Sequence, residues 1–350
     1  MLLNEKQKKI LFVILENGVM PSSNVHATLL KSGEKISLVT VKRALSEMVE
    51  SRLLAVFGSG PSTSYGASAL GRLFVPVDAR GYCSAEPDKR YGLSRYNFDL
   101  FPAVPPEIFE EGEAQVLKSA TMEYERRTKN LSDVIRKKEL ERLIIELAWK
   151  SSKIEGNTYT LLDTEKLIRE QKEAAGHDKN EARMILNHKD AFNFIYNNKK
   201  KFQTFTRVNL EKLHAIIVKD MNVDAELRKK PVGIVGSKYQ PLDNGYQIAE
   251  AVEALGKTIS RMALPHAKAL IALLGISYIQ PFEDGNKRTS RLMANALLMA
   301  HGLTPLSYRS VDENEYREAM LVFYEINSLI PFKKIFIDQY KFAAANYAVR

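Results

Sequence analysis

The stretch Gln280-Pro-Phe-Glu-Asp-Gly-Asn-Lys-Arg-Thr-Ser-Arg291 is the most informative part of the sequence. Its proline and glycine end one apolar helix, and the pattern predicts that another helix begins at about Lys287. The first N–H groups of a helix lack partners and its dipole is positive there, so this position favours an anion. Arg288 and Arg291 are three residues apart and share a helix face, where both can hold the oxygens of one phosphate.

Further residues of the stretch fit a phosphate site. Gly285 lets the backbone approach a phosphate closely, and Asn286 tolerates the turn and adds an amide donor. Asp284 lies beside the same anion, where a Mg²⁺ ion bridging to phosphate would need a carboxylate. We expect Phe282 to point into the core and to fix the loop. The alternative is an ordinary basic helix start with solvated arginines, which does not account for the acid, the glycine and the amide beside them.

The stretch resembles the Fic (Fido) signature, His-x-Phe-x-Asp/Glu-Gly-Asn-x-Arg-x-x-Arg. Every specified position matches except the first, where this chain has Gln280. The resemblance extends over about residues 113–346 and implies a helical domain with an inserted β-hairpin, the flap, at residues 231–245. Most members of this family transfer AMP from ATP to a hydroxyl group of a target protein. The resemblance therefore implies ATP and Mg²⁺ as ligands and a target protein as partner.

The resemblance also assigns roles to residues of this chain. Asp284 would hold Mg²⁺, and Gln280 occupies the position of the usual catalytic base. The flap residues Val235, Gly236, Ser237 and Lys238 would register the backbone of the target protein by strand addition. The nucleotide would be bound by residues of the helix start and by one tyrosine on the adenine side: Gly285, Asn286, Lys287, Arg288, Thr289, Ser290, Arg291 and Tyr316.

A second motif is found at Ser151-Ser-Lys-Ile-Glu-Gly-Asn157. It resembles the family's inhibitory motif, Ser/Thr-x-x-x-Glu-Gly/Asn, and it ends a helix expected around residues 140–156. Glu155 would pair with Arg291 and take the place of the terminal phosphate, so that ATP has to displace a carboxylate held against an arginine. The alternative is an ordinary helix C-terminus capped by Gly156. In some relatives the same glutamate positions water to remove AMP, so a reverse activity stays open.

The replacement of histidine by Gln280 changes the expected chemistry. Fic transferases use this histidine as the general base on the target hydroxyl, whereas an amide cannot take up a proton near neutral pH. Because general base catalysis contributes about 10²–10⁴-fold, we expect AMP transfer to be slow unless another group substitutes. Glu283 is the nearest carboxylate in sequence. His188 and His214 lie on predicted helices, and we expect both to be structural.

The apolar periodicity predicts a mainly α fold for residues 113–346. Within this domain, Pro231 to Gly245 combines β-branched residues, glycines and a final Asn-Gly, which predicts a short β-hairpin. The predicted helices cover residues 113–128, 131–152, 161–174, 181–198, 207–219, 247–262, 265–278, 287–301, 312–325 and 331–346.

Residues 1–75 predict a small winged helix-turn-helix domain. Three short helices, the third capped by Ser37, precede an extended run at 53–57 and a glycine-rich turn. The third helix carries Lys42 and Arg43, which are available for DNA phosphates or the major groove. A dimerisation or docking module is the alternative. Residues 76–112 are rich in proline and aromatic residues, which predicts an irregular connector that packs onto a neighbour.

Composition narrows the class of protein. The formal net charge is +9, which favours anionic partners such as nucleotides or nucleic acid. The single cysteine, Cys83, excludes an internal disulfide framework. No run approaches the roughly 18 apolar residues of a membrane span, so we expect a cytoplasmic protein with no membrane partner. Two functions remain open, a weak AMP transferase and a nucleotide-sensing, DNA-binding regulator, and so does a homo-oligomeric state.

Overall fold

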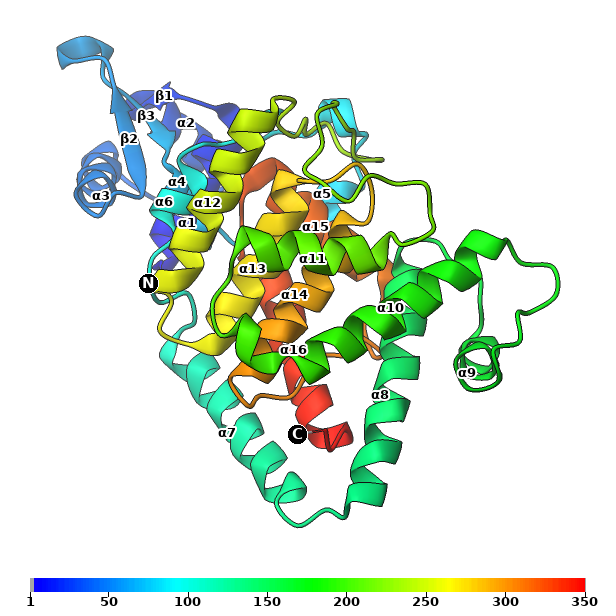
Figure 1. The fold of residues 1–350 in the computed structure, drawn as a ribbon. Helices are drawn as coiled ribbons and strands as arrows, with labels where there is room; N and C mark the ends of the chain where they lie inside the picture. Colours follow the sequence, from blue (N-terminus) through cyan, green and yellow to red (C-terminus); the bar gives the residue numbers. More distant parts are fainter. Residues whose placement is uncertain (1–2, 350) are drawn as a thin grey trace. The chain divides into compact units, whose positions relative to one another are not determined.

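The computed structural model describes residues 3–349. Its contacts divide the chain into two compact units, each assembled from separate stretches of sequence (Figure 1). Unit 1 comprises Met1–Val104, Ile234–Gln240 and Glu318–Lys333. Unit 2 comprises Pro105–Gly233, Pro241–Arg317 and Lys334–Arg350. Within the described residues, no helix is both long and apolar enough to cross a membrane.

The N-terminal part of unit 1 contains three helices and a small antiparallel sheet. The helices are α1 (Glu5–Asn17), α2 (Ser22–Lys31) and α3 (Leu38–Glu50). The strands β1 (Met20–Pro21), β2 (Leu54–Phe57) and β3 (Ser64–Ala67) form a sheet of order β1-β3-β2. The three predicted helices and the predicted extended run are present, while the two-residue strand β1 was not expected.

Local sequence explains these elements. The side chain of Ser37 accepts a hydrogen bond from Thr40 N at 3.2 Å, which caps α3 as predicted. Apolar residues at helical spacing in α1 are buried, namely Ile10, Leu11, Val13 and Ile14. On α3 the apolar residues Val41 and Leu45 are buried, whereas Leu38 and Val49 are only partly buried.

Residues 68–104 of unit 1 are mostly irregular, as their prolines predict. Its helices α4 (Ala69–Phe74), α5 (Ala79–Cys83) and α6 (Leu100–Ala103) are short. The connector is nevertheless packed, because its aromatic residues Tyr82 and Phe101 are buried. Backbone carbonyls of Leu73 and Val75 accept hydrogen bonds from Leu329 N and Ser328 Oγ, which ties α4 to residues 318–333 of the same unit.

The β-hairpin predicted for residues 231–245 is not formed. This segment contains no strand, and its chain reverses in a turn at Val235–Gly236, where Gly236 has a φ of 77°. The turn is closed by a 3.1 Å hydrogen bond from Ser237 N to Ile234 O. We keep the name flap for residues 231–245.

The missing hairpin has a physical cause. Pro231 and Pro241 remove N–H donors from the two arms of the flap, which weakens any ladder between them. In addition, Ser237 Oγ and Lys238 N donate hydrogen bonds to the carboxylate of Glu325. Apart from the bond that closes the turn, the arm after the turn therefore bonds to this other segment and not to the arm before it.

Unit 2 is helical, and every helix predicted between residues 113 and 346 is present. Only the helix expected at 161–174 is clearly shorter, because Gln171 adopts the left-handed conformation and ends it. Helices α15 (Glu313–Ile326) and α16 (Ile330–Asn346) contribute residues to both units. The other helices are α7 (Glu111–Thr128), α8 (Asp133–Ile154), α9 (Leu161–Glu170), α10 (Lys179–Asn197), α11 (Arg207–Ile217), α12 (Gly245–Arg261), α13 (Pro265–Ile279) and α14 (Asn286–Ala300).

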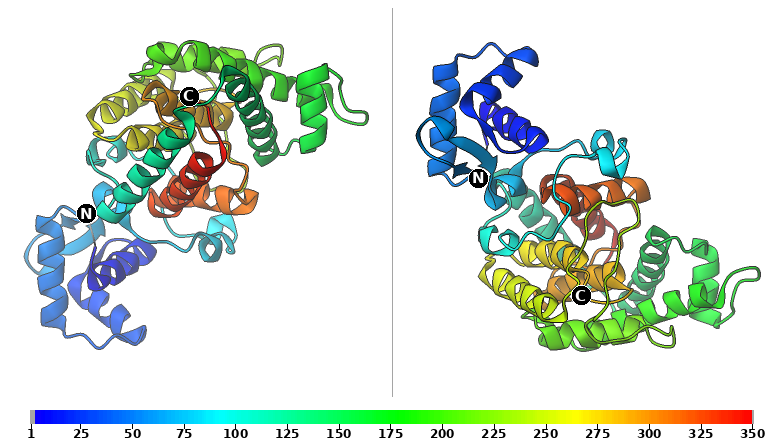
Figure 2. Two further views of the ribbon diagram at one scale, coloured as in Figure 1. Left: turned by 90° about the horizontal axis from the view of Figure 1, so that it is seen from below. Right: turned by 90° about the horizontal axis from the view of Figure 1, so that it is seen from above.

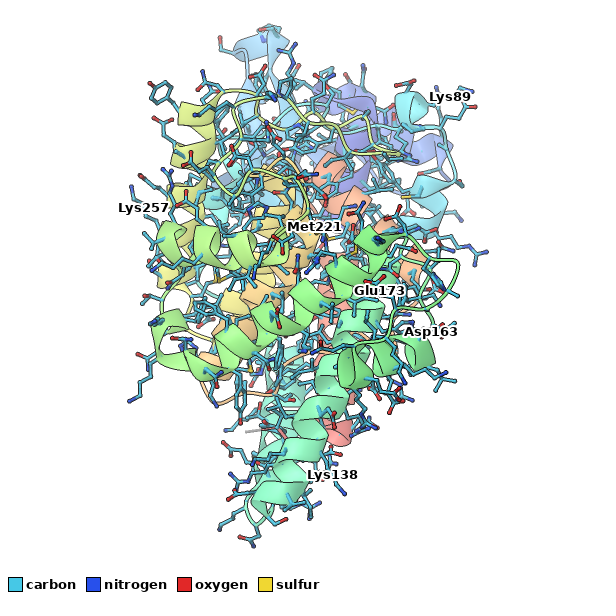
Figure 3. The ribbon with its side chains drawn as sticks, turned by 45° about the vertical axis from the view of Figure 1, so that its right-hand side comes forward. Lys89, Lys138, Asp163, Glu173, Met221 and Lys257 are labelled. Carbon is cyan, nitrogen blue, oxygen red and sulfur yellow. The ribbon has the colours of Figure 1, made fainter. Side chains whose placement is uncertain are left out.

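Helix α14 lies at the centre of unit 2. It packs against α13, α11, α10 and α8, and α13 lies beside it in the views of Figure 2. Nearly all of its side chains are buried, the polar Arg288, Arg291 and Asn295 included. Exposed lysines such as Lys138 on α8 and Lys257 on α12 point outward instead (Figure 3). A buried helix with arginines at its start requires partners for their charges, and those partners define the site.

Candidate functional site

The loop between α13 and α14 is held from inside. The side chain of Asn286 accepts a hydrogen bond from Phe282 N at 2.9 Å and donates one to Phe282 O at 2.8 Å. The buried ring of Phe282 stacks on His214, with ring centroids 3.6 Å apart. Phe282 therefore points into the core, as expected, and the side chain of Asn286 holds the loop through two hydrogen bonds.

The start of α14 is open to an anion. Gly285 is the N-cap residue in the left-handed conformation, with a φ of 76°, and it provides no side-chain cap. Thr289 is the first residue of the helix whose backbone N–H has an acceptor, which is Gly285 O at 2.9 Å. Within residues 3–349 the N–H groups of residues 286–288 have no acceptor. These donors and the positive end of the dipole create a site for negative charge.

The two arginines differ in their surroundings. Arg288 is buried, and its Nη2 donates to Asp284 Oδ2 at 3.0 Å, while Nη1 lies 3.8 Å from the sulfur of Met221 (labelled in Figure 3). Arg291 is fully buried, and its Nη1 has no hydrogen-bond partner within residues 3–349. A buried N–H without an acceptor is costly, so an oxygen of a ligand would stabilise Arg291.

Glu155 faces Arg291. Its Oε1 accepts a hydrogen bond from Arg291 Nη2 at 2.8 Å, and its Oε2 lies 3.6 Å from Lys287 Nζ. Ser151, one turn earlier, accepts from Arg291 Nε through its hydroxyl at 2.7 Å and from Nη2 through its carbonyl at 2.8 Å. The expected contact between Glu155 and Arg291 is present, and Ser151 adds two contacts that were not expected.

Charge controls the ionisation of Glu155. Burial alone would raise the pKa of this carboxyl, but the positive charge of Arg291, and after it that of Lys287, outweighs burial. The pKa of Glu155 is therefore lowered below its ordinary value, and the side chain is a carboxylate at neutral pH. This carboxylate binds the guanidinium of Arg291, which would otherwise be available to an anion.

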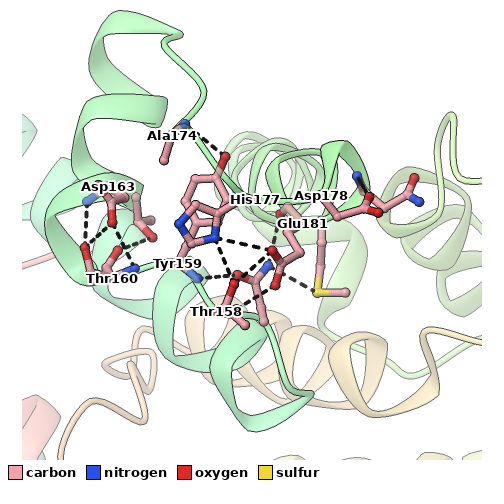
Figure 4. A network of polar contacts seen from close by, with 12 residues as sticks. Thr158, Tyr159, Thr160, Asp163, Ala174, His177, Asp178 and Glu181 are labelled. Carbon is pink, nitrogen blue, oxygen red and sulfur yellow. Dashed lines mark hydrogen bonds and ion pairs between the residues drawn. The ribbon is translucent and has the colours of Figure 1, made fainter.

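The segment after Glu155 is also fixed (Figure 4). Thr158 donates two hydrogen bonds to the carboxylate of Glu181 on α10, from its N–H at 2.6 Å and from its hydroxyl at 3.0 Å. Asn157 donates to the carbonyl of Glu181 at 3.0 Å. The rings of His177 and Tyr159 pack together at an interplanar angle of 48°, with centroids 4.4 Å apart. We call the bonds from Asn157 and Thr158 to Glu181 the clasp, because they join the residues after α8 to α10.

Gln280 lies at the end of α13 in the left-handed conformation, with a φ of 50°. Its side-chain Nε2 donates to Ser277 O at 2.6 Å, and its backbone carbonyl accepts from Arg228 Nε at 2.7 Å. Arg228 also donates to Lys230 O at 2.7 Å, so this buried arginine supports the loop. No sequence signal pointed to Arg228.

The two histidines are structural, as expected. His214 places Nε2 2.9 Å from Asp284 O and Nδ1 3.1 Å from Ala225 O, so both ring nitrogens face carbonyls. Burial lowers its pKa. His188 is fully buried, and burial, followed by the charges of Arg291 and Arg288, lowers its pKa well below the ordinary value.

Other predicted site residues are buried, and their role in binding the nucleotide stays a prediction. Thr289 and Ser290 are fully buried, and Ser290 Oγ lies 2.9 Å from Ser277 Oγ inside the core. Tyr316 is buried as well, with the guanidinium of Arg291 5.6 Å from the centre of its ring. In this structure Tyr316 therefore supports the arginine, and its role toward adenine stays a prediction.

The predicted DNA-binding residues lie in unit 1. Lys42 and Arg43 are both exposed on α3, and Arg43 lies 3.6 Å from Glu47 of the same helix. The predicted flap residues also belong to unit 1. Of these, Val235 is 100% exposed, while Ser237 and Lys238 are partly buried.

Comparison of the sequence with models of protein families identifies the class of domain. Residues 204–298 match the model of the Fic/DOC family. This range contains the flap and the whole loop between α13 and α14. The chain therefore contains a Fic/DOC domain.

Several individual proteins are similar to this chain. Protein adenylyltransferase Fic from Nematostella vectensis is 27% identical over 180 residues, which cover 48% of this chain and 40% of that protein. The protein of the same name from Culex quinquefasciatus is 28% identical over 200 residues, covering 55% of this chain and 39% of that protein. The chain thus matches about two fifths of the length of these curated relatives.

Solved structures show the same fold. Fic-1 (residues 134–508) from C. elegans aligns with a TM-score of 0.59 at 18% identity, covering 67% of this chain and 71% of that chain. A Fic family protein from Desulfovibrio desulfuricans aligns with a TM-score of 0.56 at 20% identity, covering 69% of this chain and 75% of that one. At this identity the likeness establishes the fold alone.

Proposed function

We propose that the chain binds ATP with Mg²⁺ at the start of α14 and is a Fic-type AMP transferase held in check by Glu155. One observation carries this proposal. The fully buried Arg291 stands behind an uncapped helix start, is paired with Glu155, and has no hydrogen-bond acceptor at its Nη1 within residues 3–349. A phosphate oxygen in place of the carboxylate would restore the ion pair and supply the missing acceptor.

A magnesium ion fits Asp284 only together with the nucleotide. No group of three His, Cys, Asp or Glu side chains within residues 3–349 could hold a metal by itself. Mg²⁺ usually takes one or two carboxylates and completes its shell with phosphate oxygens and water. The carboxylate of Asp284 is 63% exposed and therefore accessible. When bound, the ion would neutralise phosphate charge.

The proposed transfer places defined demands on this chain. A target hydroxyl oxygen forms a bond to the α-phosphorus of ATP, the bond from that phosphorus to the bridging oxygen breaks, and pyrophosphate leaves. Arg288, Arg291 and the N–H groups of α14 hold the negative charge. The hydroxyl proton has to leave, and the amide of Gln280 cannot accept it. Water then takes the proton, and the transfer is slow, by about 10²–10⁴-fold relative to a site with a base.

Restoring the base tests the proposal. Histidine tolerates the left-handed conformation better than most residues. In Gln280→His, the ring can donate one N–H to Ser277 O, as the amide does now, and keep the other nitrogen free to accept a proton. With Glu155→Gly in the same chain, we expect label from α-phosphate-labelled ATP to appear on the protein or on lysate proteins. A folded, ATP-binding double variant that labels nothing would exclude a latent AMP transferase for the targets tested.

The relatives support the proposal by their names, since two of them are called protein adenylyltransferase Fic. The flap residues Val235 to Lys238 are proposed to register a target's backbone by strand addition. A carboxylate in the position of Glu155 is also suited to orient a water molecule, which would allow removal of AMP from a target.

A second function is favoured by one observation in unit 1. The order α1-β1-α2-α3-β2-β3, with a three-stranded antiparallel sheet, is the order of a winged helix, and Lys42 and Arg43 on α3 are exposed. We propose on this basis a nucleotide-sensing regulator that binds DNA through α3. The missing base at Gln280 favours this function, and the retained Glu155 and flap favour the transferase.

A further inference from the structure

One arm of the flap is bonded to a buried carboxylate. Glu325, on the part of α15 that belongs to unit 1, is fully buried. Its Oε1 accepts hydrogen bonds from Ser237 Oγ at 2.7 Å and from Lys238 N at 3.3 Å. Its Oε2 accepts one from the hydroxyl of Tyr82 at 2.7 Å. Buried carboxylates with several donors are rigid, because each lost bond leaves charge unsatisfied.

Arg90 supplies the counter-charge from the connector. Its Nη1 donates to Glu325 Oε1 at 3.3 Å and to Gly236 O at 3.0 Å, so one guanidinium joins α15 to the flap turn. Its own carbonyl accepts a hydrogen bond from Lys238 Nζ. Its Nε is held by Ala85 O at 2.9 Å. We call Arg90 and Glu325 the flap clamp.

The two sides of the turn differ in their free N–H groups. After the turn, every backbone N–H from Ser237 to Gln240 is used. Their acceptors are Ile234 O, Glu325 Oε1, Ser237 Oγ and Ser94 O. Before the turn, the N–H groups of Ile234 and Val235 have no acceptor within residues 3–349.

We propose that Arg90 and Glu325 are positioning residues that fix the arm after the turn, so that a docking segment can add only to the arm before it. Strand addition needs unpaired N–H and C=O groups on an edge. The clamp binds the N–H of Lys238 directly and fixes the Ser237 hydroxyl that accepts from the next N–H, so that this arm offers no free N–H between residues 237 and 240. The N–H groups of Ile234 and Val235 stay free. This inference rests on the proposed function in one respect, the use of the flap to register a target.

Hydrogen–deuterium exchange of the full chain tests the inference without any target. We expect the amides of residues 237–240 to exchange slowly and those of Ile234 and Val235 to exchange fast. Equal exchange on both sides of the turn, or faster exchange after it, would overturn the proposal.

Substitutions test the role of the clamp. Glu325→Gln keeps the size of the side chain but removes its charge, and we expect exchange of residues 237–240 to rise about ten- to a hundredfold, as for loss of a hydrogen bond to a charged group. Ser237→Ala removes only one hydroxyl and leaves the ion pair of Arg90 and Glu325 intact. This second variant keeps the test possible if Glu325→Gln does not fold. We expect a smaller rise in the same residues. Unchanged exchange in Ser237→Ala would contradict the clamp.

The matched control is Glu86→Gln. Glu86 lies in the same connector as Arg90 but forms an exposed ion pair with Lys89, with 2.8 Å between Oε2 and Nζ. We expect this variant to leave the hydrogen exchange of the flap unchanged. An equal rise in this variant would overturn the specific role of Glu325.

The labelling experiment separates the two proposals. In the Gln280→His, Glu155→Gly background, Ser237→Ala should raise the target concentration needed for half-maximal labelling and leave ATP affinity unchanged. A changed ATP affinity with an unchanged requirement for target would overturn the positioning role. If that background labels nothing, the proposed transferase fails, while the exchange pattern of residues 234–240 still decides whether the clamp exists.

Discussion

Among single residues, Arg288 gives the simplest prediction for ligand binding. Its guanidinium is buried beside the open start of α14 and meets Asp284 at 3.0 Å. In the Glu155→Gly background we expect Arg288→Ala to weaken ATP binding by about ten- to a hundredfold, the effect of losing a hydrogen bond to a charged group. Calorimetry measures this affinity. Arg169→Ala, which removes an exposed arginine of α9, is the control and should bind as its parent does; equal loss in both would count against a specific contact.

Glu155 predicts a dependence of stability on pH. Because the pKa of Glu155 is lowered in the folded protein, the ionised side chain stabilises the fold above its ordinary pKa of 4.5, and this contribution is lost as the pH falls through the lower folded-state value. We expect Glu155→Gln to be less stable than the parent by about 1–3 kcal/mol at neutral pH, less than for a fully buried pair.

Urea unfolding at neutral pH and at a series of lower pH values measures this difference. It should shrink as Glu155 is protonated in the parent. A difference that stays constant into acid would show that the carboxylate contributes through its shape and not through its charge.

At the scale of elements, the clasp between α8 and α10 predicts a second means of releasing Arg291. Glu181 holds Thr158 and Asn157, three and two residues after Glu155. Glu181→Ala removes the two bonds from Thr158 and keeps the one from Asn157 to the backbone carbonyl. The weakened clasp should loosen the hold of Glu155 on Arg291 and tighten ATP binding several-fold, in the direction of Glu155→Gly. The control is Glu165→Ala, which removes an exposed ion pair on α9. Unchanged affinity in Glu181→Ala would mean that α8 keeps its position without the clasp.

Helices and their ends could be predicted from the sequence because their determinants are local. Ser37 and the apolar spacing of α1 and α3 specify those elements without tertiary information. The flap could not, because its backbone bonds go to Glu325 and Ser94, which are distant in sequence and carry no periodic signal. The pattern of β-branched residues and glycines predicts a hairpin, and tertiary partners override it.

The parts of the candidate site whose geometry is specified by a sequence motif could be predicted. The parts whose geometry depends on packing between distant residues could not. The three-residue spacing of Arg288 and Arg291 placed both at one helix start, and the contact from Glu155 to Arg291 followed from the second motif. The burial of Ser290 goes with its contact to Ser277 on α13, which the motif does not encode. The support from Arg228 depends on a contact across 52 residues of sequence.

At the scale of the whole molecule, unit 1 carries the test for nucleic acid. If Lys42 and Arg43 contact phosphates, binding of duplex DNA should fall steeply with salt, and the double alanine variant should lose it. A gel-shift series at low salt measures this. Lys89→Ala, which removes an exposed lysine of the connector, is the control for a general effect of charge. No retarded species at low salt would leave a docking module as the function of α1 to β3.

The central claim is that Glu155 occupies, on Arg291, the place of an ATP phosphate. Calorimetry of ATP with Mg²⁺ binding to the parent and to Glu155→Gly tests it most directly. Freed from the carboxylate at 2.8 Å, Arg291 can turn both its Nη2 and its unpartnered Nη1 toward a phosphate. We therefore predict that Glu155→Gly binds ATP about ten- to a hundredfold more tightly than the parent. Equal affinity in the two proteins, or no binding by either, would contradict the account.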